Sequence, residues 1–237
     1  MFESLLRPAD SVRATRVLDR LKSCGLAFAL TGGLAIAARL GELGAPVERK
    51  SLNDLDIVVG SWCDLQDGLA TGYLTNHIHP LAPEGKLLLQ LVSPEHQLRI
   101  DIFRQYGLTL ARAAPVPMIG NFQFVSVEDL RARATAHVCR ALGRGFIIDR
   151  KHIESFRALS TAGKPQRLVE AWRDHRETLG GTIQETTLTA HELIAANPDL
   201  IITEQYNFKS VRCAKCRPND RFVLADRNLI ASILGYA

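Results

Sequence analysis

The apolar positions of the first sixty residues switch between helical and strand-like spacing. From Ser11 to Cys24 they recur every three or four residues, which predicts a helix that stops before Gly25. A short apolar run from Leu26 to Leu30 predicts a buried strand. The alanine-rich stretch after Gly33 has helical spacing and ends near residues 41–44. The order is therefore strand, glycine turn, helix.

Three further strands are predicted before residue 105. Residues 54–59 are rich in β-branched side chains and alternate between polar and apolar positions. Residues 86–92 and 98–103 resemble the two strands of a hairpin, because a short polar turn with a proline separates them. Helices and strands are mixed along this part of the chain. The pattern therefore predicts an α/β (α+β) fold with a small mixed sheet flanked by helices.

Beyond Pro117 the pattern becomes helical. Ser126, followed three residues later by Asp129, is typical of a helix start, and we expect the next helices at 149–161 and 165–179. A further helix is expected at 189–196, capped by Thr189 and Glu192, with a strand at 200–203 and a last helix near 226–234. We therefore expect three parts: a core at 1–125, a mainly helical domain at 126–198 and a C-terminal extension at 199–237.

Composition narrows the class of protein. The chain has 237 residues, 46% of them hydrophobic and 23% charged, as in ordinary globular proteins. It has no run of about 20 apolar residues that could span a membrane, and its N-terminus lacks the apolar segment of a signal peptide. We therefore expect a cytoplasmic protein with no membrane partner.

The net charge of +4 is unevenly distributed. Basic and acidic residues nearly balance in every part of the chain except 121–180, where eleven Lys and Arg residues meet seven Asp and Glu residues. This excess has two interpretations that the sequence leaves open: solvated helix faces, or a surface that binds an anionic partner.

Three aspartates fall on two strand candidates. Side chains alternate along a strand, so Asp54 and Asp56 share one face, and Asp101 can join them if the two strands are neighbours. Three converging carboxylates repel one another unless a cation lies among them. Mg²⁺ suits such a site because it prefers oxygen ligands. The alternative without a metal site is that Asp54 and Asp56 face solvent on an edge strand, and that Gly32 and Gly33 form a simple tight turn.

The glycine turn supplies a complementary feature. Gly32 and Gly33 have no side chains to obstruct a phosphate, and the free N–H groups at the start of the next helix favour an anion. A glycine pair alone is a weak signal. A glycine pair that is followed along the chain by two aspartates on one strand and a third on a later strand is a stronger signal. This order indicates a site for a metal-chelated nucleoside triphosphate.

The chain resembles the polymerase-β-like nucleotidyltransferase superfamily, especially its AbiEii-type toxin and minimal nucleotidyltransferase branches. The likeness rests on LTGG at 30–33, NDLDIV at 53–58 and RIDIF at 99–103, and covers roughly residues 1–160. It implies a nucleotidyltransferase-fold core in which Asp54, Asp56 and Asp101 bind two Mg²⁺ ions. An NMP would move from an NTP to an acceptor hydroxyl, and pyrophosphate would leave.

The same resemblance suggests which residues contact the nucleotide. Thr31 joins Gly32 and Gly33 as a candidate, although the next residue, Leu34, supplies no hydroxyl group. Many relatives carry a Lys-Asp-x-x-Asp segment after the core. Its best match here is DRKHIES at 149–155, in which the lysine survives and the acidic positions do not. The further candidates for the triphosphate are Lys151, Arg49 and Lys50.

The acceptor is left open by the resemblance. An RNA 3′ end, a protein hydroxyl and a small molecule such as an aminoglycoside are all compatible with it, and the basic segment 121–180 favours RNA. A toxin-like enzyme would also have a cognate antitoxin protein as a partner. The competing hypothesis is a catalytically silent protein that binds a nucleotide or a partner in a toxin–antitoxin pair.

A cysteine pair near the C-terminus has the spacing of half a zinc site. Cys213 and Cys216 have no second cysteine pair nearby, and the nearest upstream histidine is His191. We therefore expect reduced thiols here rather than Zn²⁺.

Overall fold

The structure, a computed structural model, describes residues 2–61, 74–79, 88–93, 95–96, 98–203 and 222–223. The described residues form two compact units: one contains residues up to 106 together with 113–124 and 222–223, and the other contains 107–112 and 125–203. The division at 1–125, 126–198 and 199–237 stays a prediction. The expected helix near 226–234 and the pair Cys213 and Cys216 lie outside the described residues.

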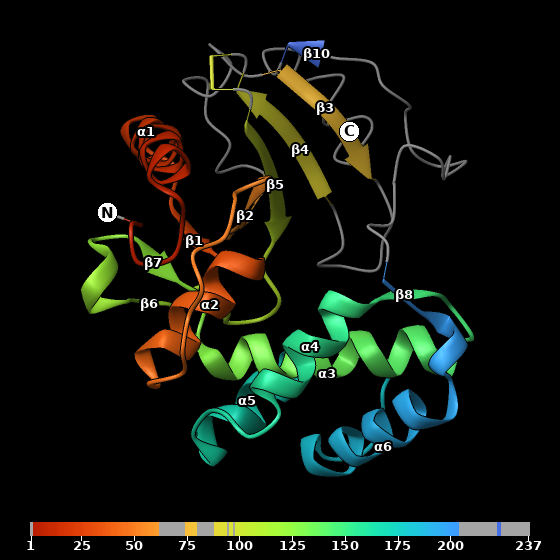
Figure 1. The fold of residues 1–237 in the computed structure, drawn as a ribbon. Coiled ribbons are helices and arrows are strands. Elements are labelled where there is room, and N and C mark those ends of the chain that lie inside the picture. The colour runs from red at the N-terminus through yellow and green to blue at the C-terminus, as the bar shows by residue number, and fades with distance from the viewer. Residues whose placement is uncertain are drawn as a thin grey trace. The chain divides into compact units, whose positions relative to one another are not determined.

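The first unit is built on a mixed sheet (Figure 1). Its strand order is β10-β3-β4-β5-β2-β1-β7-β6. The strands are β1 (Phe28–Leu30), β2 (Asp54–Val59), β3 (Leu74–His79), β4 (Leu88–Ser93), β5 (Leu98–Arg104), β6 (Ala114–Pro115), β7 (Gln123–Phe124) and β10 (Phe222–Val223). The hairpin of β4 and β5 is antiparallel as predicted, whereas β2 and β5 are parallel. The predicted α/β fold with a mixed sheet is confirmed.

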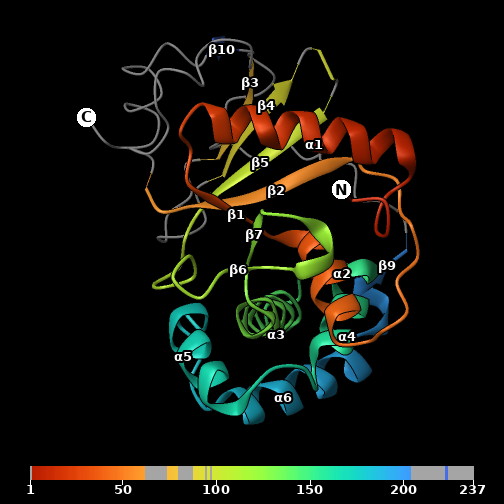
Figure 2. The same cartoon turned by 90° about the vertical axis from the view of Figure 1, so that its left-hand side faces the viewer.

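Two helices accompany this sheet. Helix α1 (Pro8–Ser23) begins three residues earlier than predicted, because a proline fits the first turn of a helix, and it buries Val17, Leu18 and Leu21. It lies along one face of the sheet in both views (Figures 1 and 2). Helix α2 (Gly32–Glu42) starts directly at the glycine turn. No helix in the described part of the chain is long and apolar enough to cross a membrane.

Strand alternation separates the sheet into an apolar and a polar face where β2 meets β5. Leu55 and Ile57 on β2 and Ile100 and Ile102 on β5 are fully buried. The intervening positions carry the three aspartates. The sheet therefore buries one row of side chains in the core and leaves the carboxylates on the other face.

The second unit is a group of helices around α3 (Val127–Gly143), joined by α4 (Arg150–Leu159), α5 (Pro165–His175) and α6 (Ile183–Ala196). Two short strands, β8 (Ile148–Asp149) and β9 (Ile201–Ile202), pair in parallel. Viewed along α3, helices α4 and α5 lie on different sides of it (Figure 2). Apolar residues from these helices form two clusters against α3, which include Phe156 and Trp172.

The predicted start of α6 and the predicted end of α5 are wrong. Helix α6 begins at Ile183 rather than at 189, and its capping box is formed by Thr182 and Glu185. The same pattern seven residues later lies inside the helix, where the Thr189 hydroxyl donates to the Glu185 carbonyl. Helix α5 ends at His175 rather than at 179, and Glu177 takes a left-handed backbone conformation with φ of 52°. The predicted cap of α3 is confirmed, since the Ser126 side chain accepts a hydrogen bond from the Asp129 amide.

A buried ionic network fixes the segment 107–112 within the second unit. Its centre is Asp129, whose carboxylate accepts hydrogen bonds from Arg112 Nε at 2.9 Å and Nη2 at 2.6 Å. The Ser126 hydroxyl donates a hydrogen bond to the same carboxylate at 2.5 Å. His175 Nε2 lies 2.9 Å from Oδ1 of that carboxylate. Arg112 also lies 2.6 Å from Asp174. Helices α3 and α5 are therefore joined through one buried carboxylate.

Candidate functional site

The sheet brings the three predicted aspartates to one face. In the parallel pairing of β2 with β5, Asp56 lies opposite Asp101 and Asp54 lies opposite Arg99. Asp101 is buried, whereas Asp54 and Asp56 are half-buried. Strand β2 lies between β1 and β5, so the alternative of an edge strand is wrong.

Arg99 is a member of this site that the sequence reasoning missed. Its Nη2 forms an ion pair with Oδ2 of Asp54, and its Nε lies 3.2 Å from Oδ1 of Asp101. The signal was present in the sequence, because Arg99 stands two residues before Asp101 and so shares its face of the strand. The guanidinium supplies positive charge to two carboxylates that would otherwise repel.

The donor chemistry fits a divalent metal, since the three carboxylates share one face and Mg²⁺ prefers such oxygens. Among the described residues, however, no group of three or more His, Cys, Asp or Glu side chains stands ready to hold a metal ion. Two of the three carboxylates pair with Arg99 instead. Metal binding by Asp54, Asp56 and Asp101 therefore stays a prediction.

The glycine turn packs directly against the aspartate face. Gly32 has a φ of +63°, and a Cβ atom added there would lie 1.8 Å from Oδ2 of Asp56. The Thr31 amide donates to the Asp56 carbonyl at 2.9 Å. A side chain at position 32 would therefore occupy the place of the Asp56 carboxylate. At Gly33, an added Cβ would meet no atom within 4 Å.

This packing places a carboxylate beside the N-terminus of α2. The backbone amides at that end carry partial positive charge, which favours a negative group nearby. Gly33 is exposed, so the first turn of α2 is open to solvent beside the half-buried Asp56. Thr31 is only 1% exposed and its side chain makes no capping hydrogen bond to α2. The turn thus offers backbone groups rather than a hydroxyl to an anion.

Gly32→Ala is expected to destabilise the protein by about 2 kcal/mol or more, because alanine strains a left-handed backbone and its Cβ displaces Asp56. Gly33→Ala is the matched control, with an expected change within about 0.5 kcal/mol. Chemical denaturation measures both. Equal stabilities of the two variants would contradict the close packing of Asp56 on Gly32.

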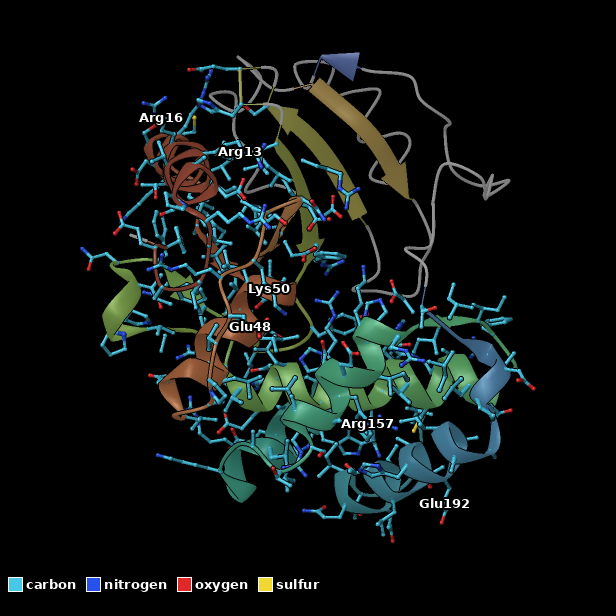
Figure 3. The ribbon with its side chains drawn as sticks, in the orientation of Figure 1. Arg13, Arg16, Glu48, Lys50, Arg157 and Glu192 are labelled. Carbon is cyan, nitrogen blue, oxygen red and sulfur yellow. The ribbon has the colours of Figure 1, made fainter. Side chains whose placement is uncertain are left out.

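The three predicted basic contacts fall in both units. Arg49 and Lys50 are exposed on the segment that leads into β2, and Figure 3 labels Lys50 there. The Lys50 amide donates to the Leu5 carbonyl, which holds this segment in place. Lys151 belongs to α4 of the second unit and is exposed, with its Nζ 3.7 Å from Oδ2 of Asp149. The role of these residues in triphosphate binding stays a prediction.

Comparison with known proteins gives no match to a family model and none to a curated protein. The chain is similar to the antibiotic-resistance factor ANT(2'')-Ia, with a TM-score of 0.46 at 15% identity, covering 77% of this chain and 96% of that one. It is similar to an antigenic nucleotidyltransferase-like protein from Paracoccidioides brasiliensis, with a TM-score of 0.47 at 16% identity over 83% and 92% of the two chains. For JHP933 from Helicobacter pylori the TM-score is 0.32 at 13% identity, over 83% and 95%. These TM-scores are below 0.5, so the case for function rests on this chain's own residues.

Proposed function

We propose that the chain is a metal-dependent nucleotidyltransferase of the polymerase-β-like superfamily. The observation that carries this proposal is the contact of a glycine turn at a helix N-terminus with Asp56, which lies opposite Asp101 on the neighbouring strand. One part of that site offers backbone N–H groups for phosphates, and the other offers carboxylates for cations.

In the proposed reaction the acceptor hydroxyl oxygen forms a bond to the α-phosphorus of the NTP. The bond from that phosphorus to the bridging oxygen breaks, and pyrophosphate leaves. The carboxylate of Asp101 takes the hydroxyl proton and passes it to water. Asp54, Asp56 and Asp101 would hold two Mg²⁺ ions, which neutralise the attacking and departing oxygens when bound.

The remaining candidates orient the nucleotide in this proposal. Gly32 and Gly33 let the triphosphate approach the open first turn of α2. Arg49 and Lys50 precede the aspartate strand in the same unit, and their exposed side chains are the proposed contacts of a phosphate. Lys151 is a further proposed contact. All three basic residues would neutralise the charge of the triphosphate.

An RNA 3′ end is the acceptor that the surface of the second unit favours. Between residues 121 and 180, Glu128 and Asp129 are buried, Asp174 pairs with Arg112, and Glu177 pairs with Arg140. Of the acidic residues there, only Glu154 and Glu170 are exposed. The exposed basic residues are Arg144, Arg150, Lys151, Arg157, Lys164, Arg167, Arg173 and Arg176. The surface is therefore far more basic than the net charge of the chain indicates, as a phosphate backbone requires.

Within that surface we define the α4 basic face as Arg150, Lys151 and Arg157. All three residues are exposed, whereas Ile153 and Phe156 form the buried side of α4 (Figure 3 labels Arg157). Positive charge is concentrated near the start of this helix. Burial lowers the pKa of the neighbouring His152, and so do Lys151 and Arg133, whereas Asp149 acts in the opposite direction.

Changing the α4 basic face to glutamine should weaken binding of single-stranded RNA by at least about tenfold at physiological salt, and should flatten the salt dependence by about two log units per log unit of salt. The control is the glutamine variant of Arg167, Arg173 and Arg176, which removes the same charge from the other side of α3. Filter binding at several salt concentrations measures both. An equal loss in the two variants would mean that net charge, rather than the α4 basic face, binds RNA.

The test of the reaction itself offers each α-labelled NTP with Mg²⁺ to an RNA pool, to a protein extract and to an aminoglycoside. Label on RNA 3′ ends supports the proposal, and growth arrest on expression would support its finer part, a toxin-like enzyme of the AbiEii-type branch with a cognate antitoxin. Label on the aminoglycoside, with drug resistance in expressing cells, would replace RNA by a small molecule. Stabilisation by NTP without transfer to any acceptor would favour the catalytically silent alternative.

A further inference from the structure

Arg99 occupies the position between two of the proposed metal ligands. It approaches Asp54 across the parallel pairing of β2 with β5, and Asp101 along its own strand. The contact with Asp54 joins two strands and spans 45 residues of sequence. One guanidinium therefore balances the charge of two carboxylates on different strands.

The Arg99 side chain is partly open to solvent, so its guanidinium can leave the two carboxylates. Its side chain is 39% exposed, as against 10% for Asp101. A long side chain with that exposure can turn its guanidinium into solvent while its carboxylate partners stay fixed in the strands. The contact with Asp54, which is 32% exposed, is likewise accessible to water and ions.

We propose that Arg99 is a resident cation of the metal-free protein, which holds Asp54 and Asp101 together and competes with the divalent metal for them. This inference rests on the proposed function, because it concerns the same carboxylates. Arg99 is a positioning residue: it acts on the metal site through Asp54 and Asp101. Metal entry and release of Arg99 are therefore one coupled step, and the guanidinium sets the metal concentration at which the site fills.

The test compares wild-type protein with Arg99→Gln and Arg99→Lys. Manganese binding is measured by electron paramagnetic resonance of free Mn²⁺, and thermal unfolding is measured in EDTA and in Mg²⁺. We expect Arg99→Gln to bind Mn²⁺ about tenfold more tightly, since a competing cation is lost. It should melt at a lower temperature than wild type in EDTA, because the carboxylates then repel, and Mg²⁺ should abolish this difference. Arg99→Lys should lie between the two proteins.

Arg104→Gln is the matched control. Arg104 lies on the same strand opposite Val59, so its loss removes one positive charge without touching the aspartates. Its affinity for Mn²⁺ should stay within about twofold of wild type. If wild type binds Mn²⁺ and Arg99→Gln binds it equally or more weakly, the proposal for Arg99 is overturned while the proposed function stands. If neither protein binds Mn²⁺, the proposed metal site is refuted, and the proposed competition by Arg99 is refuted too.

Discussion

Asp101→Asn should reduce nucleotide transfer at least about a hundredfold while leaving the protein folded. The amide keeps the size of the carboxylate, but it cannot take the acceptor proton and binds a divalent cation poorly. Asp101 is the buried member of the aspartate face and lies opposite Asp56 in the β2–β5 pairing. The rate of label transfer from an α-labelled NTP measures the loss.

Two further variants separate chemistry from folding in this experiment. Asp56→Asn should give a comparable loss, because Asp56 is paired with Asp101 across neighbouring strands and is a proposed metal ligand. Asp19→Asn removes an exposed carboxylate of α1 in the same unit and should keep full activity. Melting temperatures of all variants check that the fold is retained. Transfer by Asp101→Asn within tenfold of wild type would remove Asp101 from the proposed chemistry.

The aspartate face shows how far the sequence predicts this site. Alternation along one strand is local, so Asp54 and Asp56 could be assigned to one face directly. That Asp101 joins them depends on the parallel pairing of β2 with β5, which are neighbours in the sheet although other strands intervene in sequence. The pairing of Arg99 with Asp54 depends on the same register. It could be recognised only once the strands were known to be adjacent.

The basic helices show the opposite limit. The sequence gives the excess of positive charge in 121–180, but it does not say which charged groups are buried. Glu128 accepts a hydrogen bond from the Lys164 amide, and Asp129 is enclosed by Arg112, Ser126 and His175. These two carboxylates accept hydrogen bonds inside the unit, so they do not neutralise the basic side chains on its surface. Burial, a property of the tertiary structure, therefore decides what a partner encounters.

The same buried carboxylate gives the largest expected effect on stability. Asp129→Ala should lower the free energy of unfolding by about 3–5 kcal/mol, because it leaves Arg112 as a buried charge with its main partner removed. For a chain of this size the melting temperature should fall by about 10 °C. Glu154→Gln, which removes an exposed carboxylate from α4, is the control and should change stability by less than about 0.5 kcal/mol.

The pH dependence distinguishes a charged network from simple loss of packing, and Asp129→Asn is the variant that tests it. Burial alone would raise the pKa of Asp129, but hydrogen bonds from Arg112, His175 and Ser126 outweigh burial and hold it well below its ordinary value. A carboxyl whose pKa is lower in the folded state than in the unfolded state stabilises the protein above the unfolded pKa of about 4, and less as the pH falls below it. Asparagine does not titrate, so the stability gap between wild type and Asp129→Asn should be widest near pH 7 and should narrow steadily below about pH 4. Urea denaturation at pH 7, 5, 4 and 3 measures this difference in stability. A difference that does not change with pH would show that Asp129 stabilises the protein through packing rather than through its charge.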